Sequence, residues 1–596
     1  MKLLLLLMSA ALVLVTQAKE KPKPAGKAAS SSFLQLEDEF MKESLALSPV
    51  SASQAGYHRH KGRELDPELD DFSPASIAAQ RKFYAGWQQR LASVHDLAPE
   101  DAADRQLMSD QIGLNLLELD EIQSYKHNPT IYVELIGNGL FLPLTQNYAS
   151  KEVRVGHVLS RMNQVSRLLG QAKAALMDAD PIFVKVAAEE NDGNASLIQD
   201  DIREQVGTDA QLKKRYDEVA PKAITALKDF TQWLQQDLGK RPNPRSWRLG
   251  DKWYGKKFKL VMETNITPDE VLANAERELK QTRAEMLELA TPMHKEMYPE
   301  HGDHSDLSGR ERENKIIGEV LSKIADDHVQ RDQLLQHVKD DLAGITQFIR
   351  DKKIVSLSQR ENLKVIPTPA FMRGIYSVGG FRQAPPLEPT AEAEYWVTPI
   401  AASVPQEKAE SKLREYNNWV LKWLTIHEAL PGHYIQFEHA NSVEPETRRL
   451  LRALLGNGAY VEGWAEYVSQ VLMQEGFQNH DPRFVLSMKK IRLRVLANAI
   501  LDVRMQTMNM TDAEAIDLMT QSAFQTQAEA EGKLQRAKLS SAQLPTYYVG
   551  TSEWWDLRKK YQRAKGGKFS LMEFHDRALD EGPLPVPVVE KLLLAK

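Results

Sequence analysis

The segment His427-Glu428-Ala429-Leu430-Pro431-Gly432-His433 places two imidazoles and a carboxylate directly after an amphipathic helical run. In the zinc-peptidase motif HExxH, two histidines four residues apart lie on one helix face and bind Zn²⁺, and the glutamate beside the first activates water. Here Pro431 stands at the fourth position after His427, and the second histidine follows two residues later. On a straight helix this spacing turns His433 about 120° away from the face of His427. The segment therefore indicates an expanded or damaged zinc-binding helix.

A helix break at Pro431-Gly432 is needed to bring the two histidines together. Pro431 lacks the N–H that would bond the carbonyl of His427, and its ring clashes with that carbonyl. Gly432 accepts backbone angles that other residues refuse. The sequence therefore predicts a break or bulge that turns His433 back toward His427, because helix irregularities of this kind are frequent at functional sites. The alternative is that Pro-Gly simply ends the helix and leaves two unrelated histidines.

Glu462 is the predicted third ligand, because catalytic zinc sites use three protein ligands and keep one position open. It lies in the segment 460–467, where apolar residues keep a helical period that continues toward Gly476. Glu466 shares its face of the predicted helix. A carboxylate beside such an apolar stripe is costly to bury unless it is paired or bound to metal. The alternative is the solvated edge of an ordinary amphipathic helix.

The sequences HEALPGHYIQ (427–436) and EGWAEY (462–467) together resemble the domain of unknown function 885 family of bacteria, whose members carry HEAxPGHxxQ followed by EGWALY. Weaker similarity to that family extends over nearly the whole chain, at 55–58, 69–73, 367–369, 547–550 and 574–576. The resemblance implies a mainly helical fold and a zinc-dependent peptidase activity whose substrates are largely undefined.

The chain departs from this family pattern at three positions. Tyr434 stands where the family usually has a second histidine after HEAxPGH, Glu466 replaces the leucine of EGWALY, and Gln506 replaces a histidine. Glu466 is therefore a candidate ligand that replaces or assists Glu462. The departures leave the three proposed metal ligands intact and bear mainly on substrate specificity.

The proposed chemistry gives a role to each remaining candidate. Zn²⁺ lowers the pKa of its water, Glu428 accepts the proton as general base, and hydroxide attacks the peptide carbonyl. Tyr547, which matches a tyrosine of the family pattern, is the first candidate donor to the oxyanion, and His575 is the second. The alternative for both is an ordinary structural position. Arg536 and Arg558 are candidates to bind a substrate carboxylate, or else are ordinary surface arginines.

Length and charge agree with a large soluble enzyme. The 596 residues exceed the size at which a single core stops growing, so two or more lobes are expected. With 76 Lys and Arg against 82 Asp and Glu, the net charge is −6, which gives no indication of a nucleic-acid partner. The chain has no cysteine, so neither disulfides nor a lipid-bearing N-terminal cysteine is expected.

The N-terminus has the pattern of a signal peptide over residues 1–18, with Lys2, an apolar run over 3–15 and a small-residue cleavage site at 16–18. An uncleaved membrane anchor is the alternative, but the run is shorter than the roughly 20 residues that span a bilayer. We therefore expect export to the periplasm or the medium. Residues 19–32, rich in Lys, Pro, Ala and Ser, are predicted to form a flexible linker.

Two lobes are predicted after the linker. Residues 33–240 are expected to form a helical scaffold lobe, and residues 241–596 a catalytic lobe that contains both motifs. The helical pattern is clearest over 78–91, 153–177, 216–238 and 268–293.

Three stretches of the predicted catalytic lobe are not expected to be helical. Residues 247–262 are expected to form a hairpin or loop. Residues 394–399 are expected to form a short strand, which as an edge strand beside the metal would hold an extended peptide. His294, His301 and His304 lie in a charged stretch with Pro and Gly, and we expect an exposed loop there in preference to a metal site.

The sequence thus predicts a mainly α, large multi-helix metallopeptidase-like fold with a small β element near the active site. The expected function is that of an exported zinc metallohydrolase that cleaves peptide bonds, with Zn²⁺ as cofactor, a peptide or peptide-like substrate and no stable membrane span. Two alternatives stay open: a non-catalytic periplasmic binding or scaffold protein with the same fold, and a metal-dependent hydrolase of non-peptide amides or esters. The sequence leaves the oligomeric state open.

Overall fold

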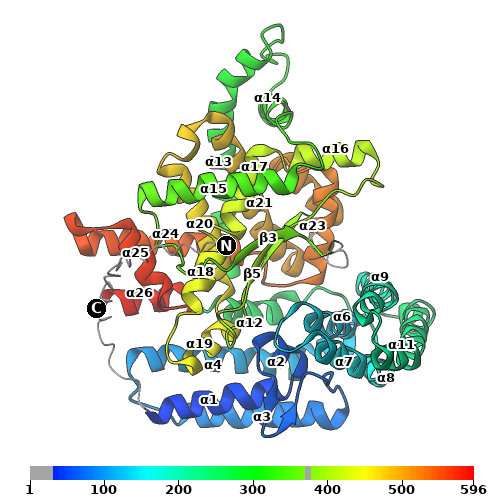
Figure 1. Cartoon of the computed structure of the whole chain (residues 1–596). Helices are drawn as coiled ribbons and strands as arrows, with labels where there is room; N and C mark the ends of the chain where they lie inside the picture. The colour runs from blue at the N-terminus through cyan, green and yellow to red at the C-terminus, as the bar shows by residue number, and fades with distance from the viewer. Residues whose placement is uncertain (1–30, 370–372, 374–377, 596) are drawn as a thin grey trace, which may run out of the picture.

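A computed structural model of the chain describes residues 31–369, 373 and 378–595 (Figure 1). The predicted signal peptide, and all of the predicted linker except its last two residues, lie outside these described residues. Helix α1 (Ser31–Ala46) begins close to the expected start of the fold, and the chain continues through helices to α26 (Val586–Leu594). The prediction of a mainly α protein is confirmed. None of the described helices is long and apolar enough to cross a membrane.

The first two fifths of the chain form two groups of helices, visible at the bottom and lower right of Figure 1. The first group contains α1, α2 (Pro49–Ala55), α3 (Pro74–Ala92) and α4 (Pro99–Leu117), with a hairpin of β1 (Arg59–His60) and β2 (Arg63–Glu64). The second contains α5 (Ser124–His127), α6 (Thr130–Thr145), α7 (Lys151–Met162), α8 (Val165–Ala175), α9 (Pro181–Leu197), α10 (Arg203–Val206) and α11 (Ala210–Gln236).

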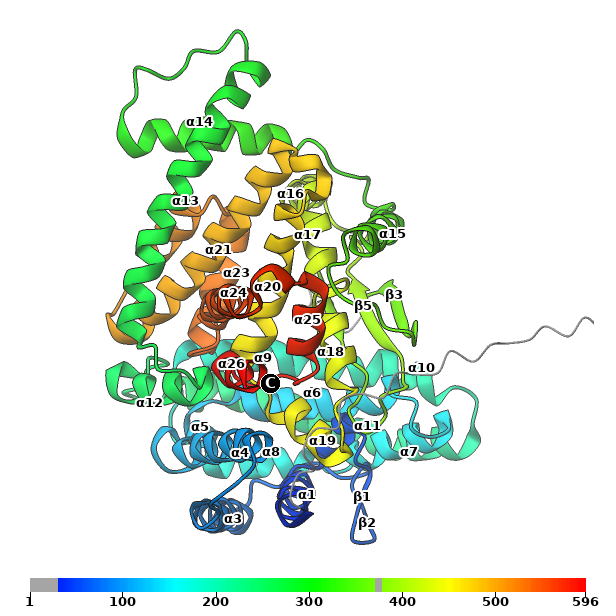
Figure 2. The ribbon, with the colours of Figure 1, turned by 90° about the vertical axis from the view of Figure 1, so that its left-hand side faces the viewer.

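The remaining three fifths build the larger body of the molecule (Figure 2). Its helices up to the candidate site are α12 (Gly250–Met262), α13 (Pro268–Met297), α14 (Gly309–Ile324), α15 (Leu334–Lys352), α16 (Gln406–Glu415), α17 (Asn418–Glu428) and α18 (His433–Ala440). They are followed by α19 (Glu446–Leu455), α20 (Gly458–Gln474), α21 (Pro482–Thr507), α22 (Asp512–Asp517), α23 (Gln527–Leu539), α24 (Thr546–Lys565) and α25 (Leu571–Leu579).

Local sequence signals account for most helix boundaries. Helix α13 begins with a capping box in which the Thr267 hydroxyl accepts from the N–H of Glu270, and the Glu270 carboxylate accepts from the N–H of Thr267. The predicted helix over 153–177 is two helices, α7 and α8. The expectation of a hairpin or loop over 247–262 is wrong, because most of the segment is helix α12, which buries Tyr254 and Phe258 on one face.

A three-stranded sheet lies beside the candidate site. It has the order β3 (Leu363–Pro367), β5 (Ala393–Val397), β4 (Gly379–Arg382), with β5 parallel to β3 and antiparallel to β4. The predicted strand is therefore present, but the expectation that it is an edge strand is wrong, because both sides of β5 are paired. Strand β4 lies at an edge of the sheet, and its Phe381 ring stacks 6.4 Å from the ring of His433.

The hydrophobic cores divide the chain differently from the predicted lobes. One core joins apolar side chains of residues 33–112 with those of residues 254–593, and a second is formed mainly by residues 132–238. Buried ion pairs add to the first core: the Arg448 guanidinium of α19 contacts the carboxylates of Asp101 and Asp104 on α4 at 2.6 and 2.5 Å. The first helices thus pack as part of the larger body, so the boundary expected near residue 240 does not separate two cores.

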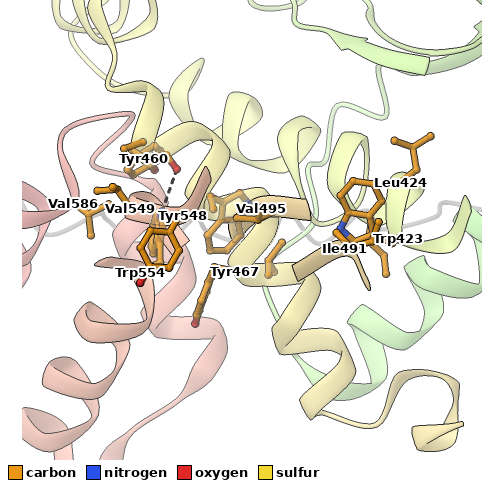
Figure 3. Close-up of a cluster of buried hydrophobic side chains, with 14 of the residues drawn as sticks. Trp423, Leu424, Tyr460, Tyr467, Ile491, Val495, Tyr548, Val549, Trp554 and Val586 are labelled. Carbon is orange, nitrogen blue, oxygen red and sulfur yellow. Dashed lines mark hydrogen bonds between the residues drawn. The ribbon is translucent and has the colours of Figure 1, made fainter. Parts of the chain in front are cut away.

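Helices α20 and α24 cross at a pair of glycines. A Cβ atom on Gly550 would lie 1.7 Å from the carbonyl oxygen of Ala459, and one on Gly463 would lie 2.3 Å from the backbone of Gly550. The backbones can therefore meet only because both residues lack side chains. Aromatic rings of the two helices surround the crossing, and the Trp554 indole donates to the carbonyl of Tyr460 at 3.1 Å (Figure 3).

We predict that Gly550→Ala lowers the free energy of unfolding by at least about 3 kcal/mol, because the added methyl group forces two packed helices apart. Gly255→Ala is the matched control, since a Cβ atom there meets nothing within 4 Å in the middle of α12. It is expected to raise stability by about 0.5–1 kcal/mol. The midpoints of urea unfolding measure both effects, and equal midpoints for the two variants would contradict the prediction.

Candidate metal centre

The segment between α17 and α18 turns the chain back on itself. Helix α17 ends at Glu428, and the N–H of Gly432 donates to the carbonyl of Ile426 at 3.0 Å. A Cβ atom on Gly432 would lie only 2.0 Å from the carbonyl oxygen of His427, so glycine is required at this position. Helix α18 then begins at His433. The predicted helix break is confirmed.

This turn brings the two predicted histidine ligands together. The rings of His427 and His433 have centroids 4.7 Å apart and lie nearly perpendicular, at 84°. Both Nε2 atoms face the Oε2 atom of Glu462 on α20, at 3.5 Å from His427 and 3.6 Å from His433. Both histidines are buried. His427, His433 and Glu462 thus form one cluster. Their candidate ligand atoms all lie within 4.8 Å of one another.

The geometry of this cluster fits a zinc ion. Ligand atoms at about 2.0–2.1 Å from a tetrahedral ion lie about 3.4 Å apart, close to the two measured distances. The Oε2 atom of Glu462 is buried and accepts no hydrogen bond from any described residue, although buried carboxylate oxygens normally have a partner. Two imidazoles and one carboxylate are also the ligand set of zinc hydrolases that keep a coordination position open.

The charges in the cluster attract one another. Burial alone would lower the pKa of His427, but the carboxylates of Glu462, Glu428 and Glu466 outweigh it and raise this pKa to about 9. Burial alone would raise the pKa of Glu462, but its contacts with His427 and His433 hold this pKa well below its usual range. The cluster therefore keeps the Glu462 carboxylate ionised, and a metal ion that bound His427 would displace the proton of this imidazole.

Glu466 lies behind His427 and does not face the other ligands. Its Oε1 atom is 3.6 Å from Nδ1 of His427, the ring nitrogen opposite the one that faces Glu462. A carboxylate in this position orients a ligating imidazole and makes it more basic. Glu466 therefore lies on the opposite side of the His427 ring from Glu462.

Gln436 takes the corresponding position behind His433, and sequence reasoning did not single it out. Its amide nitrogen lies 2.6 Å from Nδ1 of His433, and its amide oxygen is buried without a partner among the described residues. The same amide nitrogen donates to the carbonyl of Val461 on α20 at 3.1 Å, so Gln436 links His433 to the helix that carries Glu462. Gln436 is the last residue of the HEALPGHYIQ segment, which is the signal that marks it.

Trp464 holds the turn from the side of α20. Its indole N–H donates to the carbonyls of Pro431 and Gly432, at 3.0 and 3.3 Å. The ring of His575 packs edge-on against Trp464, with ring centroids 5.1 Å apart. The two predicted motifs are thus joined directly, since Trp464 belongs to EGWAEY.

The contacts of His575 differ from those expected of a donor to the oxyanion, the role predicted for it as second candidate. It is fully buried; its Nδ1 atom donates to the carbonyl of Ile354 at 2.7 Å, and its Nε2 atom accepts from the Tyr467 hydroxyl at 2.8 Å. Burial lowers the pKa of His575 to about 3, so the imidazole stays neutral. Because both nitrogens are occupied, the structure gives His575 a packing role behind Trp464.

Tyr547, the first candidate donor to the oxyanion, contacts Arg536. It lies in the first turn of α24, and the Arg536 guanidinium donates to its hydroxyl at 3.3 Å. Burial and the negative charge of Glu462 raise the pKa of Tyr547, so the phenol keeps its proton. Glu428, the predicted base, is the half-buried last residue of α17, directly beside His427.

The side chains of Tyr434 and Gln506, at the two other departures from the family pattern, form hydrogen bonds within the protein. The Tyr434 hydroxyl donates to the Asn362 side chain at 2.8 Å, and the Gln506 side chain accepts from the N–H of Leu249 at 2.9 Å. Arg558 packs over the ring of Trp555 and pairs with Glu475 at 3.8 Å. These contacts link neighbouring elements, and none of them involves a ligand of the cluster.

The fold and the cluster define a mainly helical protein with a buried two-histidine, one-carboxylate site. The chain belongs to the bacterial protein family of unknown function DUF885, whose profile matches residues 49–593.

Solved structures share this fold over nearly the whole chain. A protein from Shewanella oneidensis, described as a lipoprotein of unknown function, is 29% identical with a TM-score of 0.80, covering 95% of this chain and 100% of that one. A protein from Colwellia psychrerythraea, described as a lipoprotein, is 16% identical with a TM-score of 0.77, covering 95% of this chain and 99% of that one. A search of curated proteins found no match.

We predict that Glu466→Gln weakens zinc binding about 10–100-fold, because the amide no longer supports the ligating imidazole with a negative charge. Zinc affinity is measured by competition with a chromophoric chelator. Glu475→Gln at the end of the same helix is the matched control and should leave the affinity unchanged. Equal affinities of Glu466→Gln and wild-type protein would show that Glu466 has no part in the site.

Proposed function

We propose that this protein is a zinc-dependent hydrolase that cleaves peptide amide bonds. The observation that carries the proposal is the convergence of His427, His433 and Glu462 within 4.8 Å, with Glu428 next to the first ligand. The same residue types in HExxH enzymes bind zinc through the histidines and use the glutamate as base. In HExxH the two histidines face one metal from a single helix. Here the break at Gly432 lets His427 at the end of α17 and His433 at the start of α18 face one point.

The surrounding residues supply the remaining functions of a hydrolase. A bound zinc ion contributes Lewis-acid chemistry that activates water and polarises a carbonyl. The Glu428 carboxylate accepts the proton of the attacking water and passes it to the leaving amine. The protonated Tyr547 hydroxyl donates a hydrogen bond to the oxygen that becomes negative. Arg536, in contact with that hydroxyl, fixes its position.

Strand β4 supports a peptide as substrate. It is an edge strand of the sheet, and Phe381 on it packs against the ring of His433. An extended peptide can add to such an edge through main-chain hydrogen bonds, which favour peptides over small amides or esters. An exported location agrees with the apolar N-terminal segment and with the lipoprotein descriptions of the two similar structures.

The first test replaces the proposed base. Glu428→Gln is expected to lower kcat on a peptide library by about 10²–10⁴-fold, while one zinc per chain stays bound at this cluster, because the amide cannot accept a proton. Glu407→Gln, on the exposed first turn of α16, is the control for the same chemical change and should keep full activity.

Peptide cleavage by Glu428→Gln at the wild-type rate would refute the assignment. Wild-type protein that binds zinc but cleaves no peptide would refute peptidase activity. Parallel assays on non-peptide amides and esters then distinguish a metal-dependent hydrolase of those substrates from a binding protein without catalytic activity.

The second test concerns the donor to the oxyanion. Tyr547→Phe should lower kcat by about 10²–10³-fold with little change in KM, because the lost hydrogen bond forms mainly in the transition state. Tyr548→Phe, the neighbouring tyrosine, is the matched control and should be nearly neutral for kcat. A raised KM with unchanged kcat in Tyr547→Phe would instead assign this hydroxyl to substrate binding.

A further inference from the structure

Three histidines gather around one carboxylate at the far end of the α13–α14 pair, which projects at the top of Figure 1. His294 lies in the last turn of α13 and is 2% exposed. His301 and His304 lie in the connection to α14, and Glu319 lies within α14. The expectation that all three histidines lie in an exposed loop is therefore wrong for His294. The helices that carry the first cluster, α17, α18 and α20, lie in the middle of the molecule (Figure 2).

All three imidazoles point at the same oxygen atom. The Nε2 atoms of His294 and His304 lie 2.7 and 2.8 Å from Oε2 of Glu319, and Nδ1 of His301 lies 3.6 Å from it. The other carboxylate oxygen is held by the ammonium group of Lys315 at 2.9 Å. Lys315 thus fixes the carboxylate and leaves Oε2 to the imidazoles.

A hydrogen-bonded network is the simplest account of part of this arrangement, because the carboxylate accepts from two imidazoles. It does not account for His301, whose Nδ1 atom is too distant for a hydrogen bond to Oε2 and yet faces the same point. It also does not account for the backbone of His304, whose φ of 53° is uncommon for a residue other than glycine. The connection is therefore built so that both of its imidazoles face Glu319.

The ligand atoms of these four residues lie within 4.8 Å of one another. Ligand atoms around a tetrahedral zinc ion lie about 3.4 Å apart, so small side-chain rotations suffice to surround an ion. Imidazole nitrogens suit Zn²⁺, Cu²⁺, Ni²⁺ and Fe²⁺, whereas Ca²⁺ and Mg²⁺ prefer sites composed of oxygen atoms. With three nitrogens and one oxygen, the set matches a divalent transition metal.

We propose that His294, His301, His304 and Glu319 form a second metal site, which binds a divalent transition-metal ion and ties the α13–α14 connection to both helices. Four protein ligands close a tetrahedral coordination sphere, as in structural zinc sites. The site is separate from the His427 cluster in ligands and in position. It orders residues 298–308, which connect the two helices.

The test counts zinc ions in the full mature chain. Wild-type protein is expected to bind two zinc ions, and His433→Ala one. The double variant His301→Ala/His304→Ala should lose more than ten-fold in affinity at one site and keep the other, because half of the ligands are gone. His95→Ala, an exposed histidine outside both clusters, is the control and should bind two ions. If the His427 cluster binds no zinc but the second site does, the wild-type protein binds one ion and the double variant binds none.

A second readout separates metal binding from loss of folding. Glu319→Gln keeps the shape of the side chain but removes the charge of the ligand, and should also lose the second ion, while a cooperative urea unfolding transition of the metal-free variant shows that it is folded. In wild-type protein, zinc should slow proteolysis within residues 298–308 by at least ten-fold, with no such effect in Glu319→Gln. Unchanged zinc affinity and unchanged protection in both the double variant and Glu319→Gln would overturn the proposal.

Discussion

The close backbone contact between Gly432 and His427 is the constraint on which the candidate site depends. A residue with a side chain at position 432 would place its Cβ atom 2.0 Å from the carbonyl oxygen of His427. Without this contact the second histidine would continue on a helix, about 120° from the first. Trp464 secures the turn from α20 by donating to the carbonyls on both sides of the Pro431–Gly432 bond. The same helix, α20, therefore holds the turn and carries Glu462.

The buried charges at the site require a rigid surrounding. Ionised groups removed from water are costly unless they are paired, hydrogen-bonded or bound to metal. Here each histidine has a polar group behind it, Glu466 for His427 and Gln436 for His433. Glu462 lies on α20 directly before Gly463 of the glycine crossing with α24, and aromatic rings pack around that crossing (Figure 3). Close packing of apolar groups thus stabilises the polar site that it encloses.

The two histidine clusters contain the same residue types in different surroundings. The first joins α17, α18 and α20 in the interior, with one buried carboxylate oxygen, Oε2 of Glu462, that accepts no hydrogen bond from the described residues. The second closes the end of the α13–α14 pair, with a carboxylate that is already held by Lys315. Three protein ligands leave a position for a substrate or water, whereas four close the coordination sphere. The proposed roles, catalysis at the first cluster and support of the fold at the second, follow from this difference in the number of candidate ligands.

The sequence by itself determined the helical class and the break at Pro431-Gly432, and it singled out His427, His433 and Glu462 as candidates, because residue periodicity and the properties of proline and glycine are local. Only the tertiary structure decided that His575 packs behind Trp464, that β5 is a central strand, that the first helices join the larger core, and that His294 meets Glu319. Each of these facts is a contact between segments distant in the chain. Local patterns carry no information on which partner a side chain meets, since that choice is made when the helices pack.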